Sequence, residues 1–341
     1  MGKKARSLLK IASICFGAVL GAGFASGSEL LEFFAVFKNR GIIGVLVASF
    51  LFSLLGKEIL SNSFFLTEKT TRKYLETVFS KPMARFLSFF MTFFLAVTFC
   101  VMLSGTGAFF SQRFSLPVWV GILLMDALCF LIFMFQIKGL SVLSVAVTPL
   151  MFFGLLYLCL YGLFNESRAA FWPSVNPDGL FLPYAFFYVG YNLLTMTAVL
   201  VPTSALAEDE KTAGWGGILG GIMLGVTALL CVSALLGNES LWVSPLSMLL
   251  SSAKAGTAAH ILYSAVLFCA MLTTAVSTGF SLLSEFSTGG KDKQMAATIC
   301  LAALPLSFVP FSLLVRYFYP AFGVLGVILI LGILWHWYKG R

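Results

Sequence analysis

The residues best suited to binding chemistry lie in one stretch, from Gly17 to Glu29, which reads GAVLGAGFASGSE. Glycine costs about 1 kcal/mol relative to alanine inside a helix, so four glycines in eleven residues make this the weakest part of an apolar helix. Unwound backbone is tolerated at membrane depth only where it lines a cavity or binds something. Freed carbonyls suit Na⁺, and freed amides at a helix start suit a carboxylate. We therefore expect solute-binding contacts from Gly21, Gly23, Phe24, Ala25, Ser26 and Gly27.

A second interpretation of these glycines stays open. Gly17 and Gly21 have the GxxxG spacing by which two helices pack closely through small residues. The stretch is then either a break in the helix or a packing surface.

Carboxylates inside apolar segments are the next candidates, because an ionisable side chain is expensive there and marks a functional site by default. Glu29 follows the glycine-rich stretch directly, so we expect it to carry a proton for ion coupling or to face the site. Glu32 lies three residues on, and a position among the outer lipid headgroups suits it better. Asp126 lies midway along an apolar run; it is either a second ion-coupling group or a buried structural carboxylate bonded to hydroxyls.

Hydroxyl side chains follow one stripe of the apolar segment 258–286. Residues at these offsets share a helix face, and hydroxyls with free carbonyls supply the oxygen ligands that hard cations take. The alternative is that these hydroxyls bond to their own helix or hold two helices together. The stripe consists of Thr273, Thr274, Ser277, Thr278 and Ser281.

A third candidate stretch reads YVGYN and contributes Tyr188, Tyr191 and Asn192 as solute-binding residues. A lone glycine beside an asparagine in an apolar run predicts a second break. Breaks at corresponding positions in two halves of a transporter indicate its binding site. The alternative is a belt of tyrosines on a helix that Pro183 kinks without forming a site.

The composition requires a membrane to hold these segments. Hydrophobic residues make up 59% of the 341 and charged residues only 11%, against about 25% charged in soluble domains. A span needs about 20 apolar residues, and we expect about ten spans in an all-α integral membrane protein. The stretch 243–256 is too weak to span and is interpreted as an interfacial or loop helix. The predicted spans are 8–37, 41–61, 83–111, 117–136, 139–164, 180–206, 213–236, 258–286, 295–313 and 316–337.

The polar stretch 165–179 divides these spans into five and five. An odd number per half turns the second half upside down relative to the first, which predicts a single transmembrane domain, 1–341, built from inverted halves 8–164 and 180–337. Such repeats are typical of transporters, with the site near the midplane. The predicted architecture therefore has discontinuous first and sixth spans.

Charge distribution predicts orientation and excludes some partners. Lys and Arg concentrate in alternate loops, which places both termini on the cytoplasmic side of a bacterial cytoplasmic membrane. The net charge of +8 is then a topology signal that faces anionic lipid headgroups, and no nucleic acid is expected. Seven cysteines lie in apolar runs without a CxxC pair, and His260 and His336 lie far apart. We expect no cofactor and no metal other than Na⁺.

The run from Gly17 to Glu29 resembles the signature of the YkvI-like bacterial membrane proteins, which often show Gln where this chain has Ser28. That group is similar to the amino acid–polyamine–organocation superfamily with its LeuT-type fold. The resemblance covers the whole chain in length and span order. It implies a central site between discontinuous spans one and six. It also implies a sodium site built from the carbonyls of Gly17 and Leu20 with Thr274, Ser277 and Thr278.

Together these patterns predict a secondary active transporter of amino acids or related small organic solutes. Transport is predicted to be coupled to Na⁺ or H⁺. It is predicted to proceed by alternating access, in which spans one, two, six and seven rock against the rest. The alternative is a solute-sensing or receptor-type subunit of the same fold that binds without transport. An enzyme is not expected, because no convergent set of His, Asp or Cys is found. The expected partners are an amino-acid-like solute and the lipid bilayer.

Overall fold

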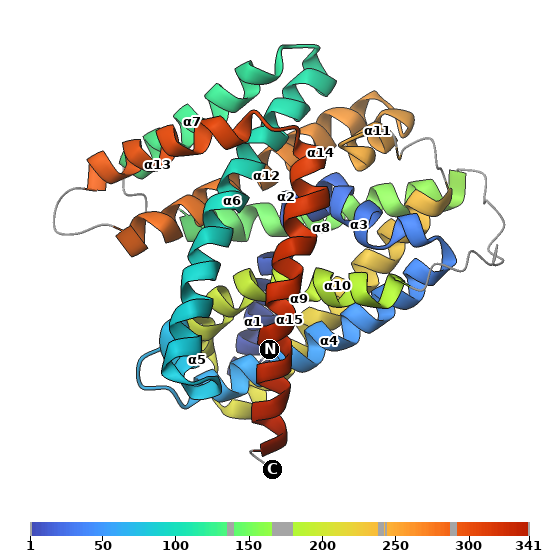
Figure 1. The fold of residues 1–341 in the computed structure, drawn as a ribbon. Helices are drawn as coiled ribbons and strands as arrows, with labels where there is room; N and C mark the ends of the chain where they lie inside the picture. Colours follow the sequence, from blue (N-terminus) through green and yellow to red (C-terminus); the bar gives the residue numbers. More distant parts are fainter. Residues whose placement is uncertain are drawn as a thin grey trace.

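The computed structural model describes residues 2–134, 140–165, 180–237, 242, 244–286 and 292–339, and every regular element among them is helical (Figure 1). The first half contains α1 (Lys3–Val19), α2 (Ala22–Ser26), α3 (Ser28–Phe33), η1 (Ala35–Phe37), α4 (Asn39–Phe64), α5 (Thr71–Val78), α6 (Lys81–Phe114), α7 (Val118–Met134) and α8 (Leu140–Asn165). The second half contains α9 (Phe181–Thr203), η2 (Ser204–Leu206), α10 (Glu210–Gly237), α11 (Ser247–Lys254), α12 (Thr257–Phe286), α13 (Asp292–Ser307), α14 (Phe311–Leu313), the π-helical turn η4 (Leu314–Phe318) and α15 (Tyr319–Lys339).

Each predicted span coincides with a helix or a group of helices. Among the described residues, six helical segments are long and apolar enough to cross a membrane: Asn39–Phe64, Lys81–Phe114, Phe181–Leu206, Glu210–Gly237, Thr257–Leu283 and Phe311–Lys339. Val118–Met134 and Pro149–Phe164 are shorter apolar helices. The weak stretch 243–256 contains only α11, eight residues long. The polar linker 166–179 lies outside the described residues, and both the count of ten and the inverted repeat stay predictions.

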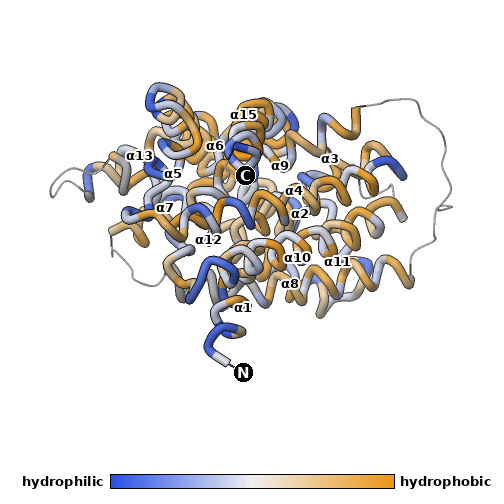
Figure 2. The backbone as a smooth tube through the Cα atoms, turned by 90° about the horizontal axis from the view of Figure 1, so that it is seen from below, coloured by the Kyte–Doolittle hydropathy of each residue, from blue (hydrophilic) through white to orange (hydrophobic). Residues whose placement is uncertain are grey.

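The helices pack in two groups (Figures 1 and 2). In the α4–α10 group, α10 runs along α4 and packs on α1, while α9 packs on α4 and α1. In the α6–α12 group, α6 packs on α7, α12 and α13. Helix α8 touches both α10 and α12, and α15 lies along α9. The short helices α2 and α3 connect α1 to α4, and α2 packs against α12 of the other group.

Glycines bring α10 and α4 into backbone contact. A Cβ on Gly217 would lie 2.4 Å from the carbonyl carbon of Gly56, and one on Gly221 would lie 2.4 Å from the amide nitrogen of Ser53. Gly216 and Gly220 make room for the side chains of Ile11 and Cys15 of α1. The glycines of α10 therefore form a packing face.

The prediction of a second helix break, near Gly190, is wrong. Helix α9 is continuous from Phe181 to Thr203. A Cβ on Gly190 would lie 2.5 Å from the carbonyl oxygen of Gly323 on α15, and one on Gly326 would lie 2.1 Å from the carbonyl carbon of Gly190. The glycine is needed for close approach of two helices, so it does not unwind its own.

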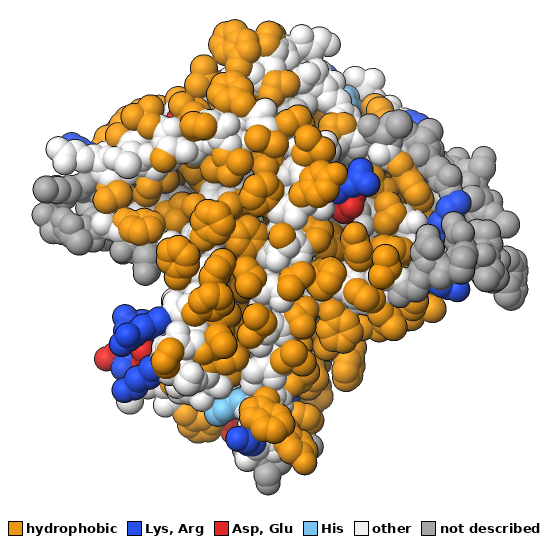
Figure 3. All heavy atoms as spheres, in the orientation of Figure 1, with side chains coloured by type: hydrophobic (Ala, Val, Ile, Leu, Met, Phe, Trp, Pro, Cys, Tyr) orange, Lys and Arg blue, Asp and Glu red, His pale blue; other side chains and the backbone are white. Residues whose placement is uncertain are grey.

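The outer surface suits lipid. Large apolar side chains such as Phe50, Phe89 and Leu331 are more than half exposed. Figure 3 shows hydrophobic side chains over most of one face of the molecule, with charged side chains in small separate groups, the densest at the lower left. Figure 2 likewise shows hydrophilic residues mostly at helix ends. Exposed apolar area on this scale marks a membrane-facing surface, since soluble monomers rarely show it.

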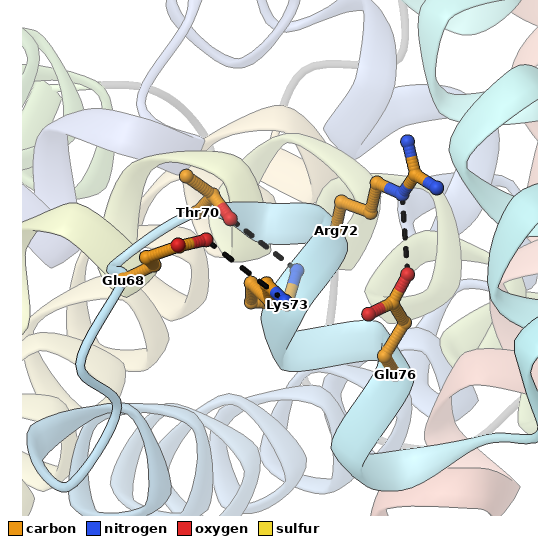
Figure 4. Close-up of polar contacts among 5 residues, drawn as sticks. All are labelled: Glu68, Thr70, Arg72, Lys73 and Glu76. Atoms are coloured by element: carbon orange, nitrogen blue, oxygen red, sulfur yellow. Dashed lines mark hydrogen bonds and ion pairs between the residues drawn. The ribbon is translucent and has the colours of Figure 1, made fainter.

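One group of charged side chains lies on and beside α5, which is in the lower half of Figure 1 together with both marked termini. Thr70 caps α5 by accepting a hydrogen bond from the backbone N–H of Lys73 at 3.4 Å. Arg72 pairs with Glu76 at 3.2 Å one turn on, and Glu68 lies 4.0 Å from the Lys73 ammonium (Figure 4). Exposed pairs of this kind contribute little stability, so they mark α5 as part of a solvated surface.

Candidate functional site

The first predicted break is present, between α1 and α2. Helix α1 ends at Val19, and the N–H of Gly21 donates to Val19 O at 2.7 Å instead of to Gly17 O. The Gly17 carbonyl has thus lost its helical donor. Helix α2 is only five residues long, and the next residue, Gly27, adopts φ +83°, a left-handed conformation that favours glycine, before α3 begins. The glycine-rich stretch is therefore a discontinuity, and its last glycine sets the turn into α3.

Side chains around the break hold α2 in place. The phenol of Tyr263 on α12 donates to Ala25 O at 2.5 Å. Ser26 donates to Gly23 O at 2.9 Å, and Ser28 donates to Pro245 O at 2.5 Å. Of the predicted solute contacts, Ala25 and Ser26 are thus engaged in bonds that fix the backbone.

Glu29, on the first turn of α3, lies against Gly23 of α2. Its side chain is buried, with 5% of the residue exposed, and its Oε2 atom has no hydrogen-bond partner. A Cβ on Gly23 would lie 1.9 Å from Glu29 Oε1. Gly23 therefore makes room for the carboxyl group, which connects the glycine-rich stretch to the acidic residue that follows it.

Three tyrosines surround this carboxyl group: Tyr188 and Tyr191 on α9 and Tyr319 on α15, each within electrostatic reach of Glu29. The hydroxyl of Tyr188 is buried without a hydrogen-bond partner, and that of Tyr191 interacts with Glu29 itself. Unpartnered buried polar atoms are costly, so the Tyr188 hydroxyl and Glu29 Oε2 together indicate a place where a ligand supplies the missing bonds.

Aromatic rings enclose the same place. Phe33 packs on Tyr188 and Tyr191 with ring centroids 5.4 Å apart, and Tyr191 packs on Tyr319 at 4.7 Å. Phe94 of α6 reaches Tyr191 at 6.1 Å. We call Glu29, Tyr188, Tyr191 and Tyr319 with these phenylalanines the Glu29 site.

The π-helical turn η4 places Tyr319 in the Glu29 site. Pro320 lacks an N–H, and in an α-helix its ring would clash with the carbonyl of Arg316 four residues back. The helix widens over Leu314–Phe318 instead, and such turns are frequent at functional sites. Tyr319 was missed by the sequence analysis, although Pro320 was a local signal that could have drawn attention to it.

The Glu29 site is closed in this structure. The cavity beside it has a volume of about 10 Å³ and is lined by Phe24, Phe34, Phe52, Tyr188 and Gly225 among others. That volume is about enough for one water molecule. Phe24 and Tyr188, both predicted solute contacts, thus line the same cavity.

The hydroxyl stripe of α12 faces the break through Thr274, whose Oγ1 would lie 3.6 Å from a Cβ on Gly21. Ser277 donates to Thr274 O at 3.1 Å, and Thr278 donates to the same oxygen at 2.9 Å. The stripe therefore bonds to its own helix, as the alternative interpretation has it. Ser277 and Thr278 act as donors in these bonds, so their oxygens keep lone pairs. The sodium site that they would form with Thr274, Gly17 O and Leu20 O stays a prediction.

Two other predicted residues lie apart from this chemistry. Asn192 donates from Nδ2 to Tyr188 O at 2.9 Å on its own helix. Asp126 is partly buried in α7 and interacts with Cys100, Cys129 and Cys300, so it is not brought to the break. Among the residues that the structure describes, no three His, Cys, Asp or Glu side chains form a metal-binding group.

Sequence comparison finds membrane proteins of similar length. The membrane protein YkvI of Bacillus subtilis (strain 168) is 28% identical over 330 residues, which cover 95% of this chain and 94% of YkvI. YyaD of the same organism is 24% identical over 337 residues, with 96% of each chain covered. This protein is a homologue of YkvI and YyaD. No family model matches the chain.

Comparison with solved structures gives the fold. A Na⁺-coupled sialic acid symporter in a substrate-bound, outward-open state matches with a TM-score of 0.64 and 16% identity, over 93% of this chain and 75% of the symporter. The manganese transporter of Eremococcus coleocola matches at 0.53 and 15% identity, over 96% and 86%. Inward-facing Mhp1 matches at 0.52 and 14% identity, over 96% and 73%. The YkvI homologue thus resembles LeuT-fold transporters in structure, as the glycine-rich motif implies.

Proposed function

We propose that this YkvI homologue is a secondary transporter of a small organic solute, driven by a Na⁺ or H⁺ gradient. One observation carries the proposal: the broken helix between α1 and α2 lies beside Glu29, a buried carboxyl group with an unpartnered oxygen. Unpaired polar groups at membrane depth persist where they line a cavity or bind something. The similarity to structures of transporters supports the same conclusion.

The packing supports a mechanism of alternating access. The α4–α10 group corresponds to predicted spans one, two, six and seven, which rock against the α6–α12 group. A Na⁺ held by Gly17 O, Leu20 O and the hydroxyls of Thr274, Ser277 and Thr278 would tie α1 to α12, and so would join the two groups. Amino acids and related compounds are the solute class we propose.

We further propose that the protein lies in the bacterial cytoplasmic membrane with both termini inside. Lys4 near the N-terminus pairs with Asp209 at 2.7 Å, which brings the α9–α10 loop to the N-terminal end. This pair holds the pKa of the Asp209 carboxyl below its usual range and raises the pKa of the Lys4 ammonium. Labelling of cysteines introduced at positions 4 and 209 in intact and in opened cells tests whether this end is cytoplasmic.

Uptake into proteoliposomes tests the transport proposal. A labelled amino-acid mixture is offered under an inward Na⁺ gradient, an inward H⁺ gradient or none. We expect accumulation that needs one gradient and that is lost in Glu29→Gln and Gly23→Leu, while Gly154→Ala, which has only ordinary contacts at 3.7 Å or more, is unaffected. Solute binding without uptake would instead identify a sensing subunit, and full uptake by both variants would remove Glu29 and Gly23 from the site.

A further inference from the structure

The Glu29 site carries more information than the presence of a solute, because it holds an acidic side chain with no basic side chain paired to it. Among the described residues no ion pair reaches Glu29. The nearby guanidinium of Arg316 lies 3.7 Å from Glu32 Oε1 and has 63% of its side chain exposed. An ionised carboxylate buried without a partner is costly. An ionised Glu29 therefore needs a positive charge from a bound ligand.

The groups that face Glu29 do not supply that charge. Tyr188 and Tyr191 face it from α9, and Tyr319 faces it from α15. The residue on α10 with an electrostatic effect on Tyr188 is Cys231, a thiol. All are neutral or become negative when they titrate, so none can neutralise a carboxylate.

The walls of the site favour a particular kind of cation. Na⁺ and Mg²⁺ take shells of oxygen ligands, but the rings of Phe33, Tyr188, Tyr191 and Tyr319 present mostly aromatic faces and edges. Aromatic rings attract ammonium groups through their quadrupoles, most strongly when the cation is desolvated. The phenol hydroxyls of Tyr188 and Tyr191 add hydrogen-bond acceptors for an N–H donor.

We propose that the Glu29 site recognises a solute by a positively charged organic ammonium group, with the Glu29 carboxylate as counter-charge and the tyrosine and phenylalanine rings as walls. This inference rests on the proposed transport function and names the class of its solute. A proton is the other occupant that can neutralise the carboxyl group. The ammonium solute and the proton then compete for one carboxyl group, so each bound cation releases a proton.

Ligand-dependent thermal stability of the purified, detergent-solubilised protein tests recognition separately from transport. The probes are choline and pentane-1,5-diamine, each beside its uncharged analogue, 3,3-dimethylbutan-1-ol and pentane-1,5-diol. Ligand binding to the native state raises the melting temperature. We expect at least one cation to stabilise the wild type while its analogue does not. Failure of both cations to exceed their analogues would overturn the proposal.

Two variants make the test specific. Glu29→Gln keeps the size of the side chain and removes the charge, and we expect it to weaken cation binding roughly 100-fold, because it removes one partner of a buried charge pair. Glu32→Gln, one helical turn on, is the matched control and should bind as the wild type does. Equal cation affinity in Glu29→Gln and wild type would also overturn the proposal.

Proton release and uptake complete the experiment. In weakly buffered solution, cation binding should acidify the medium with wild-type protein and not with Glu29→Gln; binding without proton release would overturn the exchange. Cation binding without uptake in proteoliposomes would leave recognition standing and remove the transport proposal. Uptake of glutamate or another anion that Glu29→Gln leaves unchanged would leave transport standing and overturn the assignment of an ammonium solute.

Discussion

Substituting Gly23 by alanine should separate function from folding. A Cβ at this position would lie 1.9 Å from Glu29 Oε1 and 2.5 Å from its Cδ. Restoring ordinary van der Waals contact requires the carboxyl group to move by about 1.5 Å. That group ends a flexible side chain, so the helix can keep its place while the charge moves. Alanine also favours a helix by about 1 kcal/mol over glycine.

We therefore expect Gly23→Ala to melt at or above the wild-type temperature while solute uptake falls about 100-fold, since a displacement of 1 Å in a site costs about that factor. The assay combines thermal unfolding in detergent with initial uptake rates in proteoliposomes. Gly154→Ala is the control for the same substitution in an apolar helix without a close contact.

A second variant makes the reasoning refutable. Adding Glu29→Asp to Gly23→Ala shortens the side chain by one methylene and removes the clash, so uptake should partly recover, and the two substitutions should be non-additive. If Gly23→Ala transports at the wild-type rate and affinity, the carboxyl position does not matter and the assignment of Glu29 is refuted. A lower melting temperature with unchanged uptake per folded molecule would refute it equally.

Three further outcomes are expected. Gly217→Ala drives a methyl group into the backbone of Gly56 and should destabilise the protein by about 2 kcal/mol. Melting temperature and folded yield should both fall; if neither falls, the contact between α4 and α10 can widen to admit the methyl group. The thiols of Cys159 and Cys231 lie 2.9 Å apart between α8 and α10, so mild oxidation with copper-phenanthroline should remove two titratable thiols and slow uptake, and Cys159→Ser should prevent both effects. Thr278→Ala should reduce any Na⁺ stimulation of uptake about tenfold through the loss of one oxygen ligand, and unchanged Na⁺ dependence would exclude this residue from the sodium site.

The break in the first span could be predicted because its cause is local. Four glycines weaken the helix wherever it packs, and Gly27 is placed where the chain turns with a positive φ. The position of Glu29 beside Gly23 follows from the short separation along the chain. The helical segments could also be located from hydropathy, because hydropathy depends only on the local sequence.

The continuity of α9 could not be predicted in this way. Gly190 has the same local signal as the glycines of the break, but its cause is the approach of Gly323 and Gly326, more than 130 residues away in the sequence. The place of Tyr319 beside Tyr191 also depends on a contact between distant helices. Asp126 was grouped with the ion-coupling residues by its depth, whereas packing directs it toward cysteines of three helices.

The contact between α4 and α10 has a mechanical consequence. Where Gly217 meets Gly56, backbone touches backbone with no side chain between them. At this point there are no rotamers to rearrange, and the side chains elsewhere along the contact include the small Ser49 and Ser53, so it has little capacity to relieve stress by side-chain adjustment. The two helices therefore move as one rigid body. A displacement of either helix is transmitted to the contacts of α2 and α8 with α12.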